Sequence, residues 1–198
     1  AANAFFTAGM VLFEVPTGRL LGAQAVGKGT ADKRVDVIAA LIMMGGTVED
    51  LWNLELCYSP GVSTAKDVVI HAALVAKNIL DKEFEQVPVT AVRGLVEAGA
   101  FLIDAREPGE YAAGHLTTAV NIPLSQFRDR LEEIPTDQPV YVHCRSSQRS
   151  YNMVRALHQL GRPNAVNISG SYLAISMEQY FTDKSTGRAP IVTEYNFN

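Results

Sequence analysis

Short apolar runs rich in β-branched residues alternate with helical patterns over residues 87–181, and this alternation constrains the fold more than any other feature of the chain. The expected strands are residues 87–89, 101–105, 119–122, 140–143 and 165–168, and the expected helices are residues 90–98, 124–134, 147–160 and 172–181. Strands that alternate with helices form a parallel α/β sheet with helices on both faces. In open sheets of this kind functional residues lie at the carboxyl ends of strands, where Asp104 and Cys144 fall.

The first part of the chain has a different pattern, in which a strand hairpin precedes several helices. We expect strands over residues 10–15 and 19–26, followed by a helix capped by Thr30 or Asp32. A short helix is expected to start at Thr47, with the Asp50 side chain reaching back to cap it. A long helix is expected over residues 65–80, capped by Ser63 or Thr64. Residues 81–86 are charged and lack apolar periodicity. We therefore place a boundary there, between domains of residues 1–82 and 83–198.

Composition excludes several classes of function. The 198 residues carry a formal net charge of -4, which gives no indication of a nucleic-acid partner. The longest apolar stretch, residues 37–44, is too short to cross a bilayer, so we expect no membrane partner. The cysteines, Cys57 and Cys144, lie far apart, and no cysteine/histidine cluster has zinc-ligand spacing. We expect no metal, a reducing cytoplasmic location and, since the chain starts with Ala-Ala-Asn, a piece of a longer protein.

Cys144 carries the strongest chemical signal. It follows the apolar run of residues 140–143 and precedes a polar loop with Arg145 and Arg149, where a helical pattern begins. The N–H groups of such a loop converge on one point, and the helix N-terminus adds partial positive charge there. A cysteine in this position has a lowered pKa and acts as a nucleophile. The alternative is a small buried hydrophobic residue, and the flanking arginines favour the nucleophile.

Three motifs of the second part resemble those of the rhodanese family. They are residues 104–116, with Asp104-Ala105-Arg106-Glu107-Pro108 at their start, residues 119–124, and the loop that follows Cys144. The resemblance runs from about residue 87 to residue 180 and implies a rhodanese-like fold and a sulfurtransferase. In this family the cysteine accepts a sulfane sulfur from a donor as a persulfide and passes it to a thiol acceptor. The related dual-specificity phosphatases have a longer loop than the four residues that separate Cys144 from Arg149 here.

Roles for the cradle residues follow from this chemistry. We expect Cys144 to be the nucleophile, with the loop N–H groups stabilising the thiolate and the persulfide anion. Arg149 is expected to be a charge partner of the sulfur, or else to hold the loop by bonding its carbonyls. Arg145 is expected to meet an anionic donor, or else to be a solvated surface charge. The expected lining of the cradle is Ser146, Ser147 and Gln148.

The remaining motif residues are expected to support the structure. Asp104 is expected to brace the loop through hydrogen bonds, and Arg106 to pair with a carboxylate. Glu110 fits a helix cap. The family often has glycine where Ser147 stands, which implies a positive φ, and Gly170-Ser171 replaces a more usual Gly-Gly pair.

The first part resembles the C-terminal dimerisation domain of pyridine nucleotide-disulfide oxidoreductases. The matching segments are residues 18–27, 32–36, 47–51 and 63–67. The leading strands of that domain are absent, so we expect a partial α+β domain and a homodimer formed through it.

Taken together, the two parts of the chain resemble coenzyme A-disulfide reductases that carry a C-terminal rhodanese domain. They imply FAD, NAD(P)H and coenzyme A for the parent enzyme and none of these for this chain, which has no G-x-G-x-x-G motif. Tyr58 matches a tyrosine that reaches the partner subunit's active site in that group, or else is a loop aromatic packed under the long helix. The alternative function is a non-catalytic binding module joined to a dimerisation segment.

Overall fold

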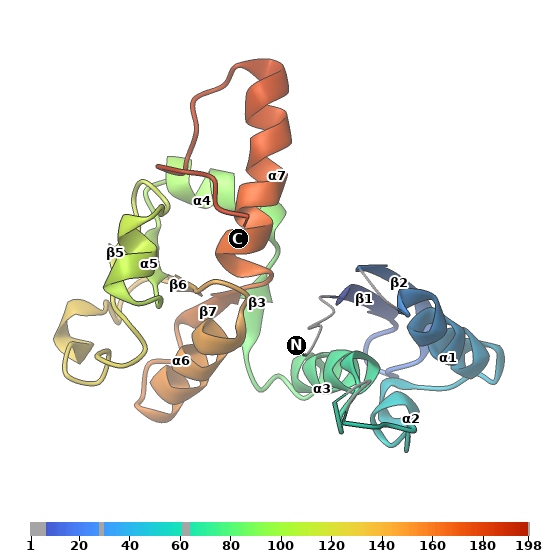
Figure 1. The fold of residues 1–198 in the computed structure, drawn as a ribbon. Coiled ribbons are helices and arrows are strands. Elements are labelled where there is room, and N and C mark those ends of the chain that lie inside the picture. Colours follow the sequence, from blue (N-terminus) through green and yellow to red (C-terminus); the bar gives the residue numbers. More distant parts are fainter. Residues whose placement is uncertain (1–6, 28–29, 61–63, 198) are drawn as a thin grey trace. The chain divides into compact units, whose positions relative to one another are not determined.

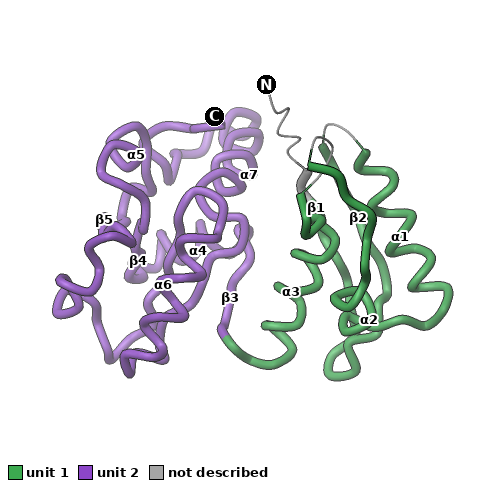
Figure 2. Tube along the Cα trace, turned by 60° about the horizontal axis from the view of Figure 1, so that its bottom comes forward, with its two compact units in different colours: residues 1–83 green, residues 84–198 purple. Residues whose placement is uncertain are grey.

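The chain folds into two compact units, residues 1–83 and residues 84–198 (Figure 2). The computed structural model describes residues 7–27, 30–60 and 64–197. Figure 1 gives the labels of the helices and strands that are used below.

The first unit consists of an antiparallel hairpin and three helices. The hairpin pairs β1 (Thr7–Phe13) with β2 (Leu20–Gly27), and the helices are α1 (Ala31–Met43), α2 (Val48–Trp52) and α3 (Val68–Leu80). Its buried core draws on all of these elements except β1, and contains Leu20, Ile38, Val48, Leu51, Val69, Ala73 and Ala76. Burial of this apolar face supplies the main stabilisation of the unit.

The capping residues of the first unit agree only in part with the prediction. Thr47 and Asp50 form the expected capping box at the start of α2. The long helix begins three residues later than predicted, because Asp67 caps it by accepting a hydrogen bond from the N–H of Val69 at 3.1 Å. Thr64 is therefore not the cap, and Ser63 lies outside the described residues.

Lys82 ends α3 in the left-handed conformation, with φ 54°. Its N–H donates to the carbonyl of Ile79, and the N–H of Glu83 donates to that of Asn78, which is the pattern of a Schellman motif. Because glycine adopts this φ without strain, Lys82→Gly is expected to stabilise the first unit by about 0.5–1 kcal/mol. Urea unfolding followed by the fluorescence of Trp52, the single tryptophan, measures this.

Gly45 offers a matched reverse control for that prediction. It closes α1 with the same two hydrogen bonds at φ 72°, and a Cβ there would meet nothing within 4 Å. Gly45→Lys should therefore destabilise the same unit by a similar amount. If both variants changed the free energy of unfolding in the same direction, strain from a positive φ would not determine the stability of these helix ends.

The second unit is built on a five-stranded, all-parallel sheet with the strand order β3-β7-β6-β4-β5. The strands are β3 (Glu85–Val87), β4 (Phe101–Asp104), β5 (Val120–Asn121), β6 (Val140–His143) and β7 (Ala165–Ile168). The helices that flank it are α4 (Val92–Glu97), α5 (Pro108–Ala112), α6 (Gln148–Gln159) and α7 (Ser171–Thr186), with short 3-10 helices at Val89–Ala91 and Leu131–Glu133 (Figure 1). The α/β class and the parallel sheet are confirmed.

The helix predicted over residues 124–134 is wrong. This segment forms successive turns, in which the N–H of Asp129 donates to Gln126 and that of Arg130 to Phe127, and it ends in the 3-10 helix. Phe127 is fully buried, and the guanidinium of Arg130 donates to the carbonyl of Asn121 at 2.9 Å. These tertiary anchors fix the segment in a tighter path than an α-helix would allow.

The residues after α7 return across the second unit and pack beside α5. Val192 forms a β-bridge with Leu116, and the N–H of Thr193 donates to the carbonyl of His115 at 2.8 Å. The hydroxyl of Tyr172 donates to the carbonyl of Glu194 at 2.5 Å. The end of the chain is thereby held close to the start of α7.

Candidate active site

The carboxyl ends of β4 and β6 lie side by side, because Asp104 is in register with His143. Cys144 follows directly, so the two residues singled out at strand ends come to the same edge of the sheet. The loop after Cys144 is short, and α6 begins at Gln148. Ser147 precedes the helix with φ 77°, which confirms the positive φ implied by the glycine common at this position.

Cys144 lies at the base of this loop and is 1% exposed. Burial alone would raise the pKa of its thiol. Hydrogen bonds from the N–H and hydroxyl of Ser150, the N–H of Ser146 and the hydroxyl of Ser171 together outweigh burial and lower that pKa. The N-terminus of α6 adds to this stabilisation of the anion. The site therefore stabilises the thiolate form of Cys144 relative to that of a free cysteine.

Ser171 and Ser150 contact Cys144, and the sequence analysis assigned neither of them a role. The Ser171 hydroxyl accepts a hydrogen bond from the Cys144 N–H at 3.1 Å and lies 3.9 Å from Cys144 Sγ. It also lies 3.2 Å from Ser147 Oγ and 3.4 Å from Ser150 Oγ. The only sequence signal for Ser171 was that it replaces the family's usual glycine. No sequence signal pointed to Ser150.

The side chains of the three predicted lining residues do not all face the cradle. Ser147 directs its hydroxyl to the carbonyl of Ile168 at 3.1 Å. Ser146 and Gln148 have exposed side chains, and the N–H of Ser146 contributes to the cradle. The cradle is thus formed mainly by backbone N–H groups and by the hydroxyls of Ser150 and Ser171.

Arg149 is held by a carboxylate from another helix. Its Nη1 and Nη2 donate to Glu110 Oε2 and Oε1 at 2.6 and 2.7 Å. This bond lowers the pKa of Glu110 and, together with the nearby Cys144, raises that of Arg149, so both side chains are charged. Glu110 also caps α5 by accepting a hydrogen bond from the N–H of Glu107, as expected. Its link to the cysteine loop was not predicted.

Asp104 and Arg106 form a buried ion pair beneath the site. Asp104 accepts hydrogen bonds from the Arg106 N–H, Nε and Nη2 at 2.6–3.1 Å. Arg106 also donates to the carbonyl of Gly114 and stacks over the Tyr172 ring at 4.1 Å. The prediction that Arg106 pairs with a carboxylate is confirmed. The Asp104 carboxylate fixes Arg106 and does not bond the cysteine loop directly.

A cavity of about 250 Å³ adjoins the loop. It is lined by Arg106, Gly109, Glu110, Ala113, Arg145, Tyr172, Leu173 and Asn196. The N–H groups of Tyr172 and Leu173 donate to the carbonyls of Cys144 and Arg145, which ties the cavity wall to the loop. Arg145 is exposed and, among the described residues, has no ion-pair partner. It is therefore free to meet an anionic ligand in this cavity.

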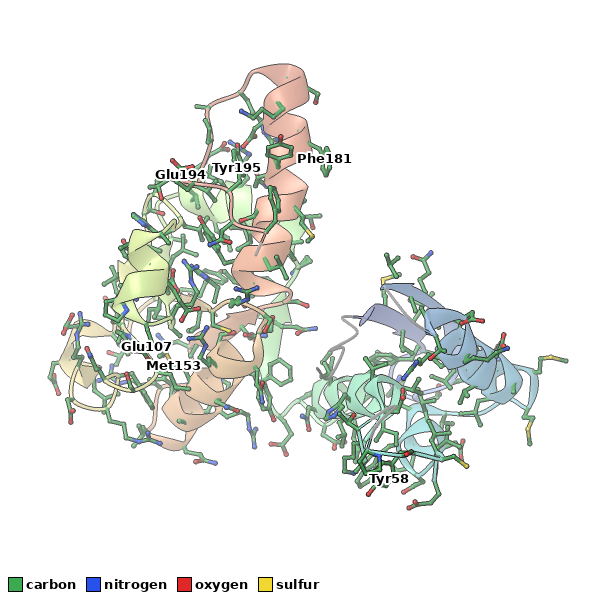
Figure 3. All side chains as sticks on the ribbon, in the orientation of Figure 1. Tyr58, Glu107, Met153, Phe181, Glu194 and Tyr195 are labelled. Carbon is green, nitrogen blue, oxygen red and sulfur yellow. The ribbon has the colours of Figure 1, made fainter. Side chains whose placement is uncertain are left out.

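Tyr58 belongs to the first unit and follows α2 in a loop (Figure 3). Its side chain is 56% exposed, so it does not pack under the long helix. Cys57 is also exposed. The cluster around Cys144 is built by residues of the second unit.

The described residues contain neither a candidate metal site nor a helix able to span a membrane. Within the described ranges, no three His, Cys, Asp or Glu side chains come together as a possible metal site. No helix in the described part of the chain has both the length and the apolar character needed to cross a membrane.

Comparison with known proteins places the cysteine loop in a family. The model of the rhodanese-like domain matches residues 89–178. A sulfurtransferase of Allochromatium vinosum is 37% identical over 73 residues, which cover 37% of this chain and 68% of that protein. A coenzyme A disulfide reductase of Staphylococcus epidermidis is 44% identical over 59 residues, which cover 30% of this chain and 14% of that protein.

Two solved structures resemble most of the chain. Reduced CoADR-RHD of Bacillus anthracis matches with a TM-score of 0.82 and 39% identity, over 87% of this chain and 31% of that one. A NAD-dependent persulfide reductase from A. fulgidus matches with a TM-score of 0.71 and 30% identity, over 84% of this chain and 33% of that one. This chain spans about a third of each of these structures.

Proposed function

The chain belongs to the rhodanese-like family, and on that premise we propose that Cys144 takes up one sulfane sulfur atom as a persulfide and passes it to a thiol acceptor. The observation that carries the proposal is the environment of Cys144. Its thiol is buried, yet N–H groups and two hydroxyls lower its pKa. A buried thiol that is surrounded by these hydrogen-bond donors is suited to be a nucleophile and not a packing residue.

The reaction needs two displacements and no external oxidant. The Cys144 thiolate attacks the sulfane sulfur of the donor, whose bond to that sulfur breaks with the electron pair leaving on the donor. The persulfide then holds its outer sulfur within the cradle of N–H groups. An acceptor thiolate attacks this outer sulfur, the bond to Sγ breaks, and Cys144 leaves as a thiolate. A lowered pKa makes Cys144 a better leaving group in the second step.

The other loop residues complete the proposed site. Arg149 stabilises charge on the sulfur, and Arg145 attracts an anionic donor or acceptor into the adjoining cavity. Asp104 and Arg106 support the wall of that cavity. Ser146, Ser147 and Gln148 shape the loop, with Ser146 contributing its N–H.

Intact mass spectrometry tests the proposal directly. The chain is incubated with thiosulfate or polysulfide and then treated with cyanide. A gain of about 32 Da on Cys144 that cyanide removes supports the sulfur carrier. No gain, with the thiol still free, would instead favour a rhodanese-fold binding module.

The ionisation of Cys144 gives a second expected result. Alkylation by iodoacetamide needs the thiolate, so its rate rises with pH and reaches a plateau above the pKa of Cys144. Because that pKa is lowered, the midpoint is expected below that of a free cysteine peptide, about 8.5. The measurement uses Cys57→Ser, in which Cys144 is the single thiol. A midpoint at or above the peptide's would contradict the proposed cradle.

For the parent protein we propose a reductase of disulfide, persulfide or polysulfide substrates. The support is the likeness to a coenzyme A disulfide reductase and to a NAD-dependent persulfide reductase. FAD, NAD(P)H and coenzyme A would then bind to parts of the parent outside this chain. The first unit would form a homodimer, in which Tyr58 reaches the partner subunit's active site. We assign residues 1–82 and 83–198 of this chain as two domains of the parent protein. We place that protein in the cytoplasm, where its thiols stay reduced.

A further inference from the structure

Ser147 and Ser171 adopt backbone conformations that favour glycine, and their side chains meet beside Cys144. Their φ angles are 77° and 50°, and among the described residues the only other non-glycine residue with a positive φ is Lys82. The two hydroxyl oxygens lie 3.2 Å apart. Backbone strain of this kind persists where the surrounding structure fixes it, and such positions cluster at functional sites. The pair therefore points to a use for two hydroxyl groups that glycine could not supply.

The hydroxyl of Ser171 has two acceptors for its one proton. A serine hydroxyl donates one hydrogen bond and accepts through two lone pairs. One lone pair accepts the N–H of Cys144 at 3.1 Å. The same oxygen lies 3.3 Å from the carbonyl oxygen of Ile168 and 3.9 Å from Cys144 Sγ, within reach of a hydrogen bond to either. The acceptor that the proton takes therefore depends on the charge that Sγ carries.

Ser147 competes with Ser171 for the Ile168 carbonyl. Its hydroxyl donates to that carbonyl at 3.1 Å, a shorter distance than the 3.3 Å from Ser171. A carbonyl that already accepts one hydrogen bond attracts a second donor less, because part of its negative charge faces the first. While Ser147 occupies Ile168, the proton of Ser171 is left for Cys144 Sγ.

The charge on Sγ changes during the proposed reaction. In the free thiolate the negative charge lies on Sγ, and hydrogen bonds to an ionised group are about twice as strong as those between neutral groups. In the persulfide the charge lies on the outer sulfur, and Sγ is a neutral bridging atom that accepts weakly. The bond from Ser171 is therefore strongest when Cys144 is a thiolate, in agreement with the part of this hydroxyl in lowering the pKa of the thiol.

We propose that Ser171 is a catalytic residue of the release step, in which its hydroxyl bonds Cys144 Sγ, and that Ser147 positions it by occupying the Ile168 carbonyl. The acceptor thiolate attacks the outer sulfur, the bond from that sulfur to Sγ breaks, and its electron pair stays on Sγ. Ser171 keeps its proton, and its hydrogen bond strengthens as this charge develops. Sulfur uptake gains nothing from the same bond, because Sγ loses its charge in that step. The inference deepens the proposed function, since it rests on a persulfide at Cys144.

Ser171→Ala removes the hydroxyl and keeps the Cβ. The test uses the Cys57→Ser chain, in which Cys144 is the single thiol, at a pH above the alkylation midpoints with and without Ser171→Ala. Intact mass follows loading from polysulfide and, after the polysulfide is removed, release to 2-mercaptoethanol. We expect release to be about threefold or more slower in the variant, because its leaving thiol has the higher pKa, and loading to be no slower. Equal release rates would overturn the inference, and so would an equal slowing of both steps, which a loosened cradle would cause.

The pH profile of alkylation gives a readout from the thiol alone. Loss of a donor to the thiolate should move the midpoint of Ser171→Ala to higher pH. The charge of Arg149, which also interacts with the sulfur, is the same in both chains. A midpoint that does not rise contradicts the inference, whether or not sulfur loads. Failure of the unmodified chain to load sulfur would instead contradict the proposed function, and the inference with it.

Ser147→Ala tests the positioning role. Without this hydroxyl the proton of Ser171 divides between Ile168 and Cys144 Sγ, so release should slow, but by less than in Ser171→Ala. Ser147→Ala/Ser171→Ala should release sulfur no more slowly than Ser171→Ala, because Ser147 acts through Ser171. Losses that multiply in the double variant would show that the two serines act independently.

Ser185→Ala is the matched control, since it removes a hydroxyl from the same helix, where Ser185 donates to the carbonyl of Thr182 at 3.2 Å. It should change neither the release rate nor the alkylation midpoint. A similar effect in this variant would contradict a specific role for Ser171. If Ser171→Ala does not fold, Ser171→Gly, which adopts φ 50° without strain, must show the same slower release.

Discussion

Replacing Cys144 with serine is expected to abolish sulfur loading. A serine hydroxyl has nearly the size of the thiol and can accept the same hydrogen bonds, so the loop should keep its conformation. It is not ionised near neutral pH and forms no stable persulfide, so the first displacement cannot occur. The loss of sulfur transfer from thiosulfate or polysulfide should be about a thousandfold or more, as is usual when a nucleophile is removed. Intact mass measures the loading of sulfur onto the chain, and product formation measures its transfer to the acceptor.

Cys57→Ser is the matched control, because it makes the same substitution at the other cysteine of the chain. Cys57 is exposed in the first unit, and no proposed step involves it. This variant should load one sulfur atom and release it to cyanide like the unmodified chain. Persistent loading of Cys144→Ser, or loss of loading in Cys57→Ser, would show that Cys144 is not the carrier.

The sequence predicted the centre of the second unit well because of how that sheet is buried. Strands β6 and β7 are almost wholly buried, so their residues form short, mainly apolar runs whose ends are clear. Residues 124–134 also have apolar spacing, but there the burial of Phe127 and the bond from Arg130 to Asn121 decide the path. Such contacts depend on the tertiary fold, and spacing alone does not reveal them.

The same distinction separates the predicted and missed parts of the site. Cys144 and its loop are contiguous, so a strand, a polar loop and a helix start were enough to find them. Ser171 is 27 residues from Cys144, and Glu110 is 39 residues from Arg149. Both reach the loop because parallel strands bring distant connections to one edge of the sheet. Glu110 was assigned a helix cap from its local motif, and its second contact required the fold.

Asp104→Asn is expected to destabilise the second unit by about 3–5 kcal/mol, the usual effect of breaking a buried ion pair. The side chains of Asp104 and Arg106 are 0% and 3% exposed. Asparagine keeps the shape of the residue but removes its charge, and it turns an N–H group toward one of the guanidinium nitrogens. An arginine side chain stays protonated in proteins, so the guanidinium charge would remain buried here without a carboxylate.

Urea unfolding followed by far-UV circular dichroism measures this loss, while the fluorescence of Trp52 reports the first unit, which should be unchanged. Glu133→Gln makes the same change of carboxylate to amide in the exposed pair with Arg130 and should cost less than about 1 kcal/mol. Asp104→Asn/Arg106→Met removes both charges and should be more stable than Asp104→Asn alone, because the uncompensated cation is gone. A double variant less stable than Asp104→Asn would mean that Arg106 contributes mainly through its stacking on Tyr172 and its bond to Gly114.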